Sequence, residues 1–111
     1  IGALGLGDIG KHFSDTDERY RGISSLVLLE KTYEMMDERG YEISNLDAII
    51  LIEKPKMAPY IQKMKENISE VLKCDIANIN IKATRGEKLG FIGNEEGAVS
   101  QCVVMLKKKG I

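Results

Sequence analysis

Apolar residues recur every three or four positions in two stretches of the chain, as they do on one face of an α-helix. The first stretch lies between Gly22 and Gly40, where Ser24 is a favourable N-cap and Gly40 a typical helix stop. The second runs from Pro59, which a first helical turn tolerates, to about Lys73. The pattern therefore predicts two amphipathic helices, each of which must bury its apolar face against another element.

Three further segments have the pattern of β-strands. Residues 46–52 form a nearly continuous apolar run, which predicts a strand covered on both faces. Ile79, Ile81 and Ala83 alternate with polar residues, so one face of this strand is expected toward a core and the other toward solvent or a partner. Residues 97–107 predict a longer final strand. Because neither helix can bury its face without a sheet, we expect an α/β sandwich, with the helices packed on one face of a mixed β-sheet.

Composition and charge narrow the classes of protein. The chain has 111 residues and a formal net charge of -1, so it lacks the basic excess by which proteins bind nucleic acid or anionic membranes without specificity. No apolar run approaches the roughly 20 residues needed to cross a bilayer, and no signal peptide is recognisable. We expect one cytoplasmic domain over residues 1–111, without a nucleic-acid or membrane partner. Its start without a methionine, inside an Ala/Leu/Gly stretch, is expected of a domain that lacks its N-terminal part.

Few cysteine and histidine side chains are available to bind a metal. Cys74 and Cys102 form no CxxC pair, and His12 is the single histidine. A disulfide scaffold, a thiolate zinc site and a site with two imidazoles are therefore not expected from these residues alone.

The first segment with candidate chemistry is residues 7–17, which combine glycines with Asp8, Asp15 and Asp17. Such a loop can hold hydroxyl groups or, through a divalent ion, phosphate oxygens. A plainer interpretation is that residues 14–17 form only turns and caps. The residues alone leave both interpretations open.

Two more segments follow predicted strands. Residues 53–57 continue the apolar strand, and Lys56 beside Pro55 is either an anion ligand on a stiff turn or part of a solvated charged turn. Residues 84–97 contain four glycines, which let a backbone approach a ligand closely. In this segment Thr84, Arg85 and Lys88 are possible donors, and Glu87 is a possible metal ligand. Because the segment has no Walker or Rossmann pattern, a phosphate loop and an ordinary glycine-rich hairpin both remain possible.

Taken together, the three segments resemble one family, the 2-C-methyl-D-erythritol 2,4-cyclodiphosphate synthases of non-mevalonate isoprenoid biosynthesis. The resemblance rests on LGDIGKHFSDTD at residues 6–17, on EKPKM at 53–57, and on IKAT at 81–84 followed by EKLGF at 87–91. It covers this whole chain and the C-terminal two thirds of the family's pattern. It implies a phosphorus–oxygen lyase that cyclises a 4-(cytidine diphospho)-2-C-methyl-D-erythritol 2-phosphate-type substrate and releases CMP.

The resemblance also implies cofactors and an assembly. Members of the family hold a zinc ion through one aspartate and two histidines, and a magnesium or manganese ion with help from a glutamate that matches Glu87. The DxHxF and HSDGD motifs that supply the zinc ligands do not occur in this sequence. The family assembles as a homotrimer whose active sites are shared between subunits, and we expect the same here.

By the same resemblance, residues 8–10 bind the erythritol and phosphate portion of the substrate, and residues 13–17 form a mobile loop over it. Residues 55–57 line the cytidine pocket, Thr84 contacts the nucleotide phosphates, and Phe91 lies at the phosphate end. The expected substrate-binding residues are Asp8, Ile9, Gly10, Phe13, Ser14, Asp15, Thr16, Asp17, Glu53, Pro55, Lys56, Met57, Thr84, Gly86, Glu87 and Phe91.

Three residues depart from the family's pattern. Arg85 and Gly86 stand where members commonly carry threonine or another small polar residue. Arg85 is a candidate catalytic residue, because a guanidinium group matches a pair of phosphoryl oxygens in geometry. Asn94 stands where an arginine often meets the phosphates. A non-catalytic cytidine-nucleotide-binding module of the same fold, or a purely structural trimerisation domain, remains the alternative function.

Overall fold

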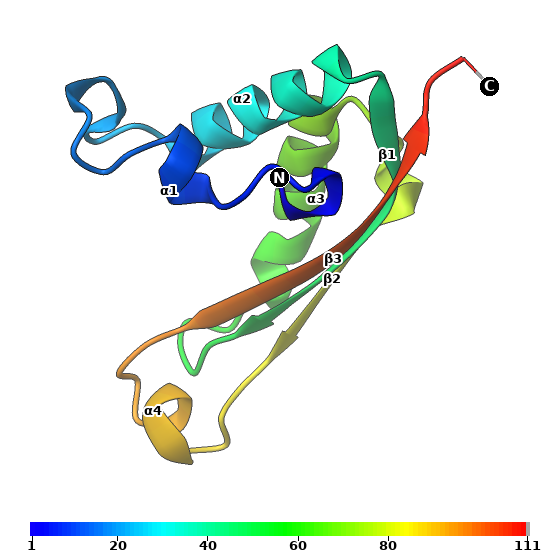
Figure 1. Ribbon diagram of the computed structural model, residues 1–111. Helices are drawn as coiled ribbons and strands as arrows, with labels where there is room; N and C mark the ends of the chain where they lie inside the picture. The colour runs from blue at the N-terminus through cyan, green and yellow to red at the C-terminus, as the bar shows by residue number, and fades with distance from the viewer. Residues whose placement is uncertain (111) are drawn as a thin grey trace.

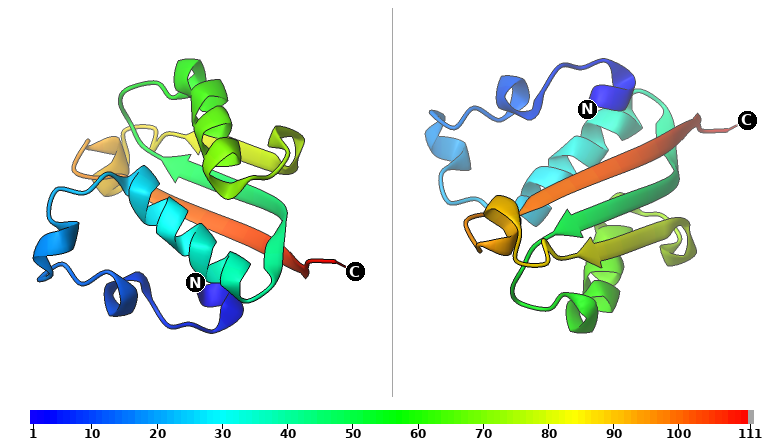
Figure 2. Two further views of the ribbon diagram at one scale, coloured as in Figure 1. Left: turned by 90° about the horizontal axis from the view of Figure 1, so that it is seen from above. Right: turned by 90° about the horizontal axis from the view of Figure 1, so that it is seen from below.

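The computed structural model describes residues 1–110, which form two layers (Figure 1). One layer is a three-stranded sheet of β1 (Tyr41–Leu51), β2 (Ile79–Thr84) and β3 (Val99–Lys108), in the order β2-β1-β3. Strand β1 pairs in parallel with β2 and antiparallel with β3. The other layer is α2 (Ser25–Glu38) and α3 (Ala58–Leu72), which lie across one face of the sheet (Figure 2). The predicted α/β class, with helices on one face of a mixed sheet, is confirmed.

Short helical turns make up the remaining regular structure. No helix within residues 1–110 has both the length and the apolar character to span a membrane. The short helices are η1 (Gly2–Leu4), α1 (Ile9–His12), η2 (Glu18–Tyr20), η3 (Ile76–Asn78) and α4 (Gly90–Gly93).

The two long helices begin and end close to the predicted residues. Ser24 caps α2, because its side-chain oxygen accepts a hydrogen bond from the Leu26 N–H at 3.2 Å. Gly40, with φ of 79°, lets the chain turn into β1. Helix α3 has Pro59 in its first turn and ends at Lys73, which adopts a left-handed conformation.

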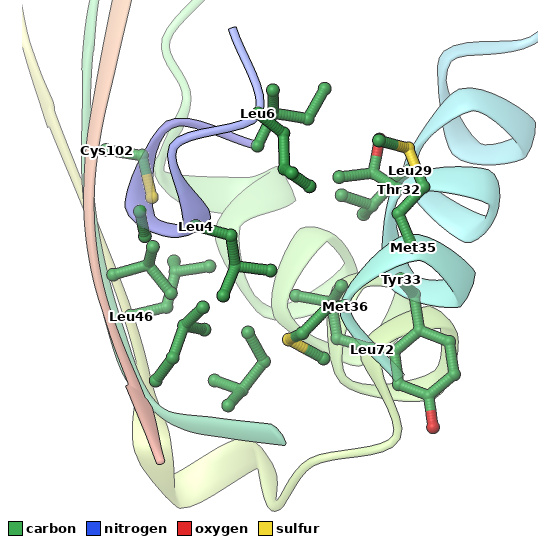
Figure 3. A pocket seen from close by; sticks show the side chains of 15 residues that line it. Leu4, Leu6, Leu29, Thr32, Tyr33, Met35, Met36, Leu46, Leu72 and Cys102 are labelled. Carbon is green, nitrogen blue, oxygen red and sulfur yellow. The ribbon is translucent and has the colours of Figure 1, made fainter. Parts of the chain in front are cut away.

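The core lies between the helices and the sheet. Met36, Ile43 and Leu72 are buried there, one each from α2, β1 and α3. Figure 3 shows side chains of α2, of the sheet and of the N-terminal segment around an apolar cavity of about 180 Å³. Ile79 and Ile81 are buried on β2, so the predicted alternation is confirmed for these two residues, whereas Ala83 is exposed.

Strand β1 starts at Tyr41, five residues before the predicted start. The prediction began at residue 46 because residues 41–45 mix apolar and polar side chains and do not extend the apolar run. Its pairing with β3 passes from Ile43 opposite Leu106 to Asn45 opposite Met105, which makes Ser44 an extra, bulged residue. The bulge places Ile43 and Leu46 on the same face although they are three residues apart, and both line the apolar cavity.

Within residues 1–110, no element covers the opposite face of the sheet (Figure 2). Coverage of residues 46–52 on both faces was therefore a wrong expectation for this part of the chain. The bare face carries Val103, which is 77% exposed, beside a polar group centred on Asp47. The Asp47 carboxylate accepts hydrogen bonds from Lys82 at 2.9 Å and Asn80 at 3.0 Å, and these bonds lower its pKa below the usual value.

Candidate functional site

A pocket of about 400 Å³ opens where the parallel strands β1 and β2 end. The carboxyl ends of parallel strands meet at one edge of a sheet, which is where α/β proteins place many ligand sites. The pocket is formed by the loop after β1, the first turns of α3, and the end of β2 with the loop that follows. Its lining residues are Ile52, Pro55, Lys56, Met57, Ala58, Ile61, Ala83, Thr84, Arg85 and Glu87.

The lining combines an apolar surface with charged groups. Lys56 and Arg85 contribute cations from two different loops, and Glu87 contributes a carboxylate. Cations of this kind bind phosphate groups, and a carboxylate can share a magnesium ion with phosphate oxygens. The structure thus brings together six predicted site residues, namely Pro55, Lys56, Met57, Thr84, Arg85 and Glu87.

Four apolar residues of the lining were not predicted from the sequence. Ala58 and Ile61 belong to the first turns of α3, Ile52 directly follows β1, and Ala83 lies near the end of β2. Their sequence pattern is that of ordinary core positions. The one available signal is their place next to the EKPKM segment and to Thr84, which brings them to the same edge of the sheet.

The turn that carries Glu87 has an unusual backbone. Glu87 and Lys88 have φ angles of 51° and 64°, and the Leu89 N–H donates to the carbonyl oxygen of Gly86 at 2.9 Å. A left-handed conformation costs a non-glycine residue about 1–2 kcal/mol. Two such residues in succession require contacts from outside the turn to hold them.

Part of that support is a close approach between Gly86 and α4. A Cβ atom on Gly86 would lie 2.4 Å from the backbone nitrogen of Gly93, and one on Gly93 would lie 2.2 Å from the carbonyl carbon of Lys88. No side chain fits in either place. The two glycines therefore let α4 pack directly on the turn that presents Glu87.

Glu53 also supports this turn and does not line the pocket. Its side chain is only 8% exposed, and one carboxylate oxygen accepts a hydrogen bond from the Gly86 N–H at 3.0 Å. The neighbouring Ile52 N–H donates to the Thr84 carbonyl at 3.0 Å, and Lys54 pairs with Glu95 at 3.1 Å. The loop after β1 is thus tied to both loops that flank α4.

The N-terminal site residues make local contacts. Asp8 caps α1 by accepting from the Lys11 N–H at 2.9 Å, and the hydroxyl groups of Ser14 and Thr16 lie 2.8 Å apart. Asp17 pairs with Arg19 at 2.7 Å, and the hydrogen bonds from Arg19 hold the pKa of the Asp17 carboxyl below its usual range. These are the turns and caps of the plainer interpretation.

Residues 8–17 do not join the pocket in this chain. Figure 1 shows the segment at the level of α2, well away from α4 and the ends of β1 and β2. Ile9 is 57% exposed on it, with no role in the pocket lining. Phe91, on α4, is also exposed and lies outside the lining. Residues 8–17 and the predicted residues that line the pocket are therefore two separate groups in one chain.

Residues 1–110 contain no group of three or more His, Cys, Asp or Glu side chains that could hold a metal ion. The ring nitrogen Nε2 of His12 lies 2.6 Å from the Leu6 carbonyl oxygen, so it is occupied by the backbone. A zinc site of three protein ligands does not fit these residues. A magnesium ion does fit Glu87, because such ions are commonly bound by one or two carboxylates together with waters and substrate phosphates.

Known proteins are similar in sequence to this chain over nearly its full length. The model of the YgbB family matches residues 1–107. The 2-C-methyl-D-erythritol 2,4-cyclodiphosphate synthase of Desulfitobacterium hafniense (strain DSM 10664 / DCB-2) is 57% identical over 97% of this chain and 68% of its own length. The protein of the same name from Geobacillus sp. (strain WCH70) is 53% identical over 98% of this chain and 69% of its own length.

Solved structures share the fold. The bifunctional IspDF of Campylobacter jejuni superposes with a TM-score of 0.91 at 42% identity, over 96% of this chain and 29% of that protein. IspF of Plasmodium falciparum, solved as a CDP complex, has a TM-score of 0.84 at 29% identity, over 98% of this chain and 65% of that protein. The chain thus spans about two thirds of the length of the Desulfitobacterium hafniense and Plasmodium falciparum relatives.

Proposed function

We propose that this chain, which belongs to the family of 2-C-methyl-D-erythritol 2,4-cyclodiphosphate synthases, carries out the reaction for which that family is named. It is then a phosphorus–oxygen lyase of non-mevalonate isoprenoid biosynthesis. The observation that carries the proposal is the pocket at the ends of β1 and β2, where the family-like segments 53–57 and 84–87 meet.

The reaction is an intramolecular phosphoryl transfer. An oxygen of the substrate's 2-phosphate attacks the β-phosphorus of the cytidine diphosphate group and forms a new phosphorus–oxygen bond. The bond from that phosphorus to the bridging oxygen breaks, and CMP leaves with the electron pair. Such chemistry asks a protein mainly to position the reacting groups and to neutralise their charge.

The pocket supplies groups for both tasks. Pro55, Lys56 and Met57 receive the cytidine end of the substrate, and the apolar lining beside them suits the face of a base. Thr84 donates to the nucleotide phosphates. Arg85 places a guanidinium group where it can pair with two oxygens of the transferred phosphoryl group. The Plasmodium falciparum relative forms a complex with CDP, which supports a cytidine diphosphate ligand for this pocket.

Glu87 is the proposed protein ligand of a magnesium or manganese ion. When bound, the ion neutralises oxygens of the diphosphate. Glu87 lines the same pocket as Lys56 and Arg85, so its carboxylate and the two cations face one ligand site. Because residues 1–110 do not fit a zinc site, no step of the reaction is assigned to zinc.

We further propose that each active site is completed by a neighbouring subunit of a homotrimer. The separation of residues 8–17 from the pocket supports this arrangement, because one chain does not bring the two predicted groups together. Asp8, Ile9 and Gly10, with the loop from Phe13 to Asp17, then face the pocket of another copy. The cytoplasmic location stays a prediction from the sequence.

The test is product formation by the intact gene product. With the cytidine diphosphate substrate and Mn²⁺, we expect CMP and the cyclic diphosphate in equal amounts, measured by chromatography and phosphorus NMR. Glu87→Gln removes one negative charge at nearly constant volume, and we expect it to lower kcat at least about a hundredfold while the fold is retained. Binding of CDP by the wild-type protein without any turnover would favour the alternative, a non-catalytic nucleotide-binding module.

A further inference from the structure

Glu53 is a buried acid that lies outside the pocket lining. It is 8% exposed, and its carboxylate forms no ion pair within residues 1–110. A buried charge without a cation is costly unless hydrogen bonds satisfy it. The protein hydrogen bond of its carboxylate in this part of the chain comes from the Gly86 N–H, at 3.0 Å.

The bond reaches the backbone at the start of the turn that carries Glu87. Gly86 is followed by two residues with left-handed backbones, and its carbonyl oxygen accepts the hydrogen bond that closes the turn at Leu89. Glu53 therefore holds one side of Gly86 while the glycine contact with α4 holds the other. Strained backbone of this kind persists only where its surroundings determine it, and it gathers at ligand-binding sites.

We propose that Glu53 is a positioning residue, whose carboxylate fixes the Gly86 amide so that the following turn presents Glu87 to the diphosphate and its divalent ion. This inference rests on the proposed function for the role of Glu87. It gives Glu53 a task different from the direct substrate contact expected from the family resemblance. The burial of Glu53 and its absence from the pocket lining both favour an action through the loop.

The first experiment measures the contact itself by amide hydrogen exchange of Gly86. Glu53→Ala removes the acceptor, and we expect exchange at least about tenfold faster, as for the loss of one hydrogen bond. Glu53→Gln keeps a carbonyl oxygen that accepts the same bond, and we expect exchange close to the wild-type rate. Glu70→Ala, which removes an exposed glutamate on α3, is the matched control.

The second experiment separates positioning from substrate contact. In Glu53→Ala we expect the Mn²⁺ concentration for half-maximal activity to rise about tenfold, in the range found for residues that orient metal ligands. The dissociation constant for CMP should stay within about twofold of wild type, because Glu53 does not line the pocket and the Lys54–Glu95 ion pair still ties the loop that carries Lys56. Glu53→Gln should restore the Mn²⁺ response. Glu53→Asp, whose carboxylate is one methylene short of Gly86, replaces Glu53→Ala if the alanine variant does not fold.

Two outcomes would overturn the proposal. One is wild-type exchange of Gly86 in Glu53→Ala, which would mean that the contact does not hold the loop. The other is an equal loss of kcat and of CMP affinity in Glu53→Gln and Glu53→Ala, which would mean that the charge itself acts on the substrate. If the wild-type protein forms no cyclic product, the proposed function fails, yet the exchange rates still decide whether Glu53 holds Gly86.

Discussion

Arg85 gives the pocket a second cation besides Lys56. A guanidinium group keeps its charge at every physiological pH and binds two phosphoryl oxygens at once, which threonine cannot do. We expect Arg85→Thr to lower kcat about tenfold or more, with a smaller change in KM, if the arginine acts mainly on the developing charge. Steady-state kinetics with the cytidine diphosphate substrate measure both constants.

The matched control is Arg39→Thr, which removes the same charge from the exposed end of α2. We expect this variant to have the wild-type rate. If Arg85→Thr also turns over at the wild-type rate, the arginine is incidental to catalysis and only borders the pocket.

At the scale of single residues, the sequence predicts which segments meet more reliably than where each side chain points. Lys56 and Thr84 follow two strands that proved to be parallel neighbours, so their meeting is a consequence of topology. Glu53 belongs to the same segment as Lys56, but its side chain points to the Gly86 backbone. This direction depends on burial and on a hydrogen bond from a residue 33 positions away, which no local pattern encodes.

Among the elements, α4 depends most strictly on the size of two residues. A Cβ atom on Gly93 would lie 2.2 Å from the backbone of Lys88, so Gly93→Ala must push α4 away from the turn. We expect a loss of about 1–3 kcal/mol in the free energy of unfolding, as for other overpacked sites. Thermal unfolding followed by circular dichroism measures it, as a fall in Tm of at least about 4 °C.

Gly2→Ala is the control for this substitution, because a Cβ atom there meets nothing within 4 Å. It should leave Tm unchanged. An unchanged Tm in Gly93→Ala as well would mean that α4 does not pack on the turn in solution.

The existence and type of the long elements could be predicted, because their periodicity is strong and their caps are chemically distinct. Ser24 and Pro59 mark the starts of α2 and α3 within one or two residues. The start of β1 could not be predicted, because the short alternation of residues 41–44 breaks at the bulge and does not continue in phase into the apolar run. The single turn α4 is too short for any period and exists because Gly86 and Gly93 allow close packing.

For the whole molecule, the separation of residues 8–17 from the pocket leads to a test by mixing subunits. Asp8→Asn and Glu87→Gln should each abolish activity alone, because each removes a charge from one group of site residues. If a site takes Asp8 from one subunit and Glu87 from its neighbour, random assembly of equal amounts leaves about one quarter of the sites intact. We therefore expect about one quarter of the wild-type rate after the two variants are unfolded and refolded together.

Variants refolded separately and then combined without exchange of subunits are the control, and they should stay inactive. Continued inactivity of the co-refolded mixture would place Asp8 and Glu87 in the same chain's site, or in no common site. The sequence could predict this arrangement only through its family resemblance, because no periodicity in a single chain specifies a subunit number.

The bulge at Ser44 determines where strand β1 can gain or lose a residue without turning its core-facing side chains outward. A strand alternates its side chains with a period of two, so an inserted or deleted residue turns every later side chain to the other face. Ser44 is the exception, because its loss would leave Ile43 and Leu46 two positions apart and still on the helix side. Past this position, one lost residue would turn the core-facing side chains that follow it in β1 to the bare face of the sheet. Natural length variants of this strand should therefore gather at residues 44–45, whereas the rest of β1 accepts substitutions alone.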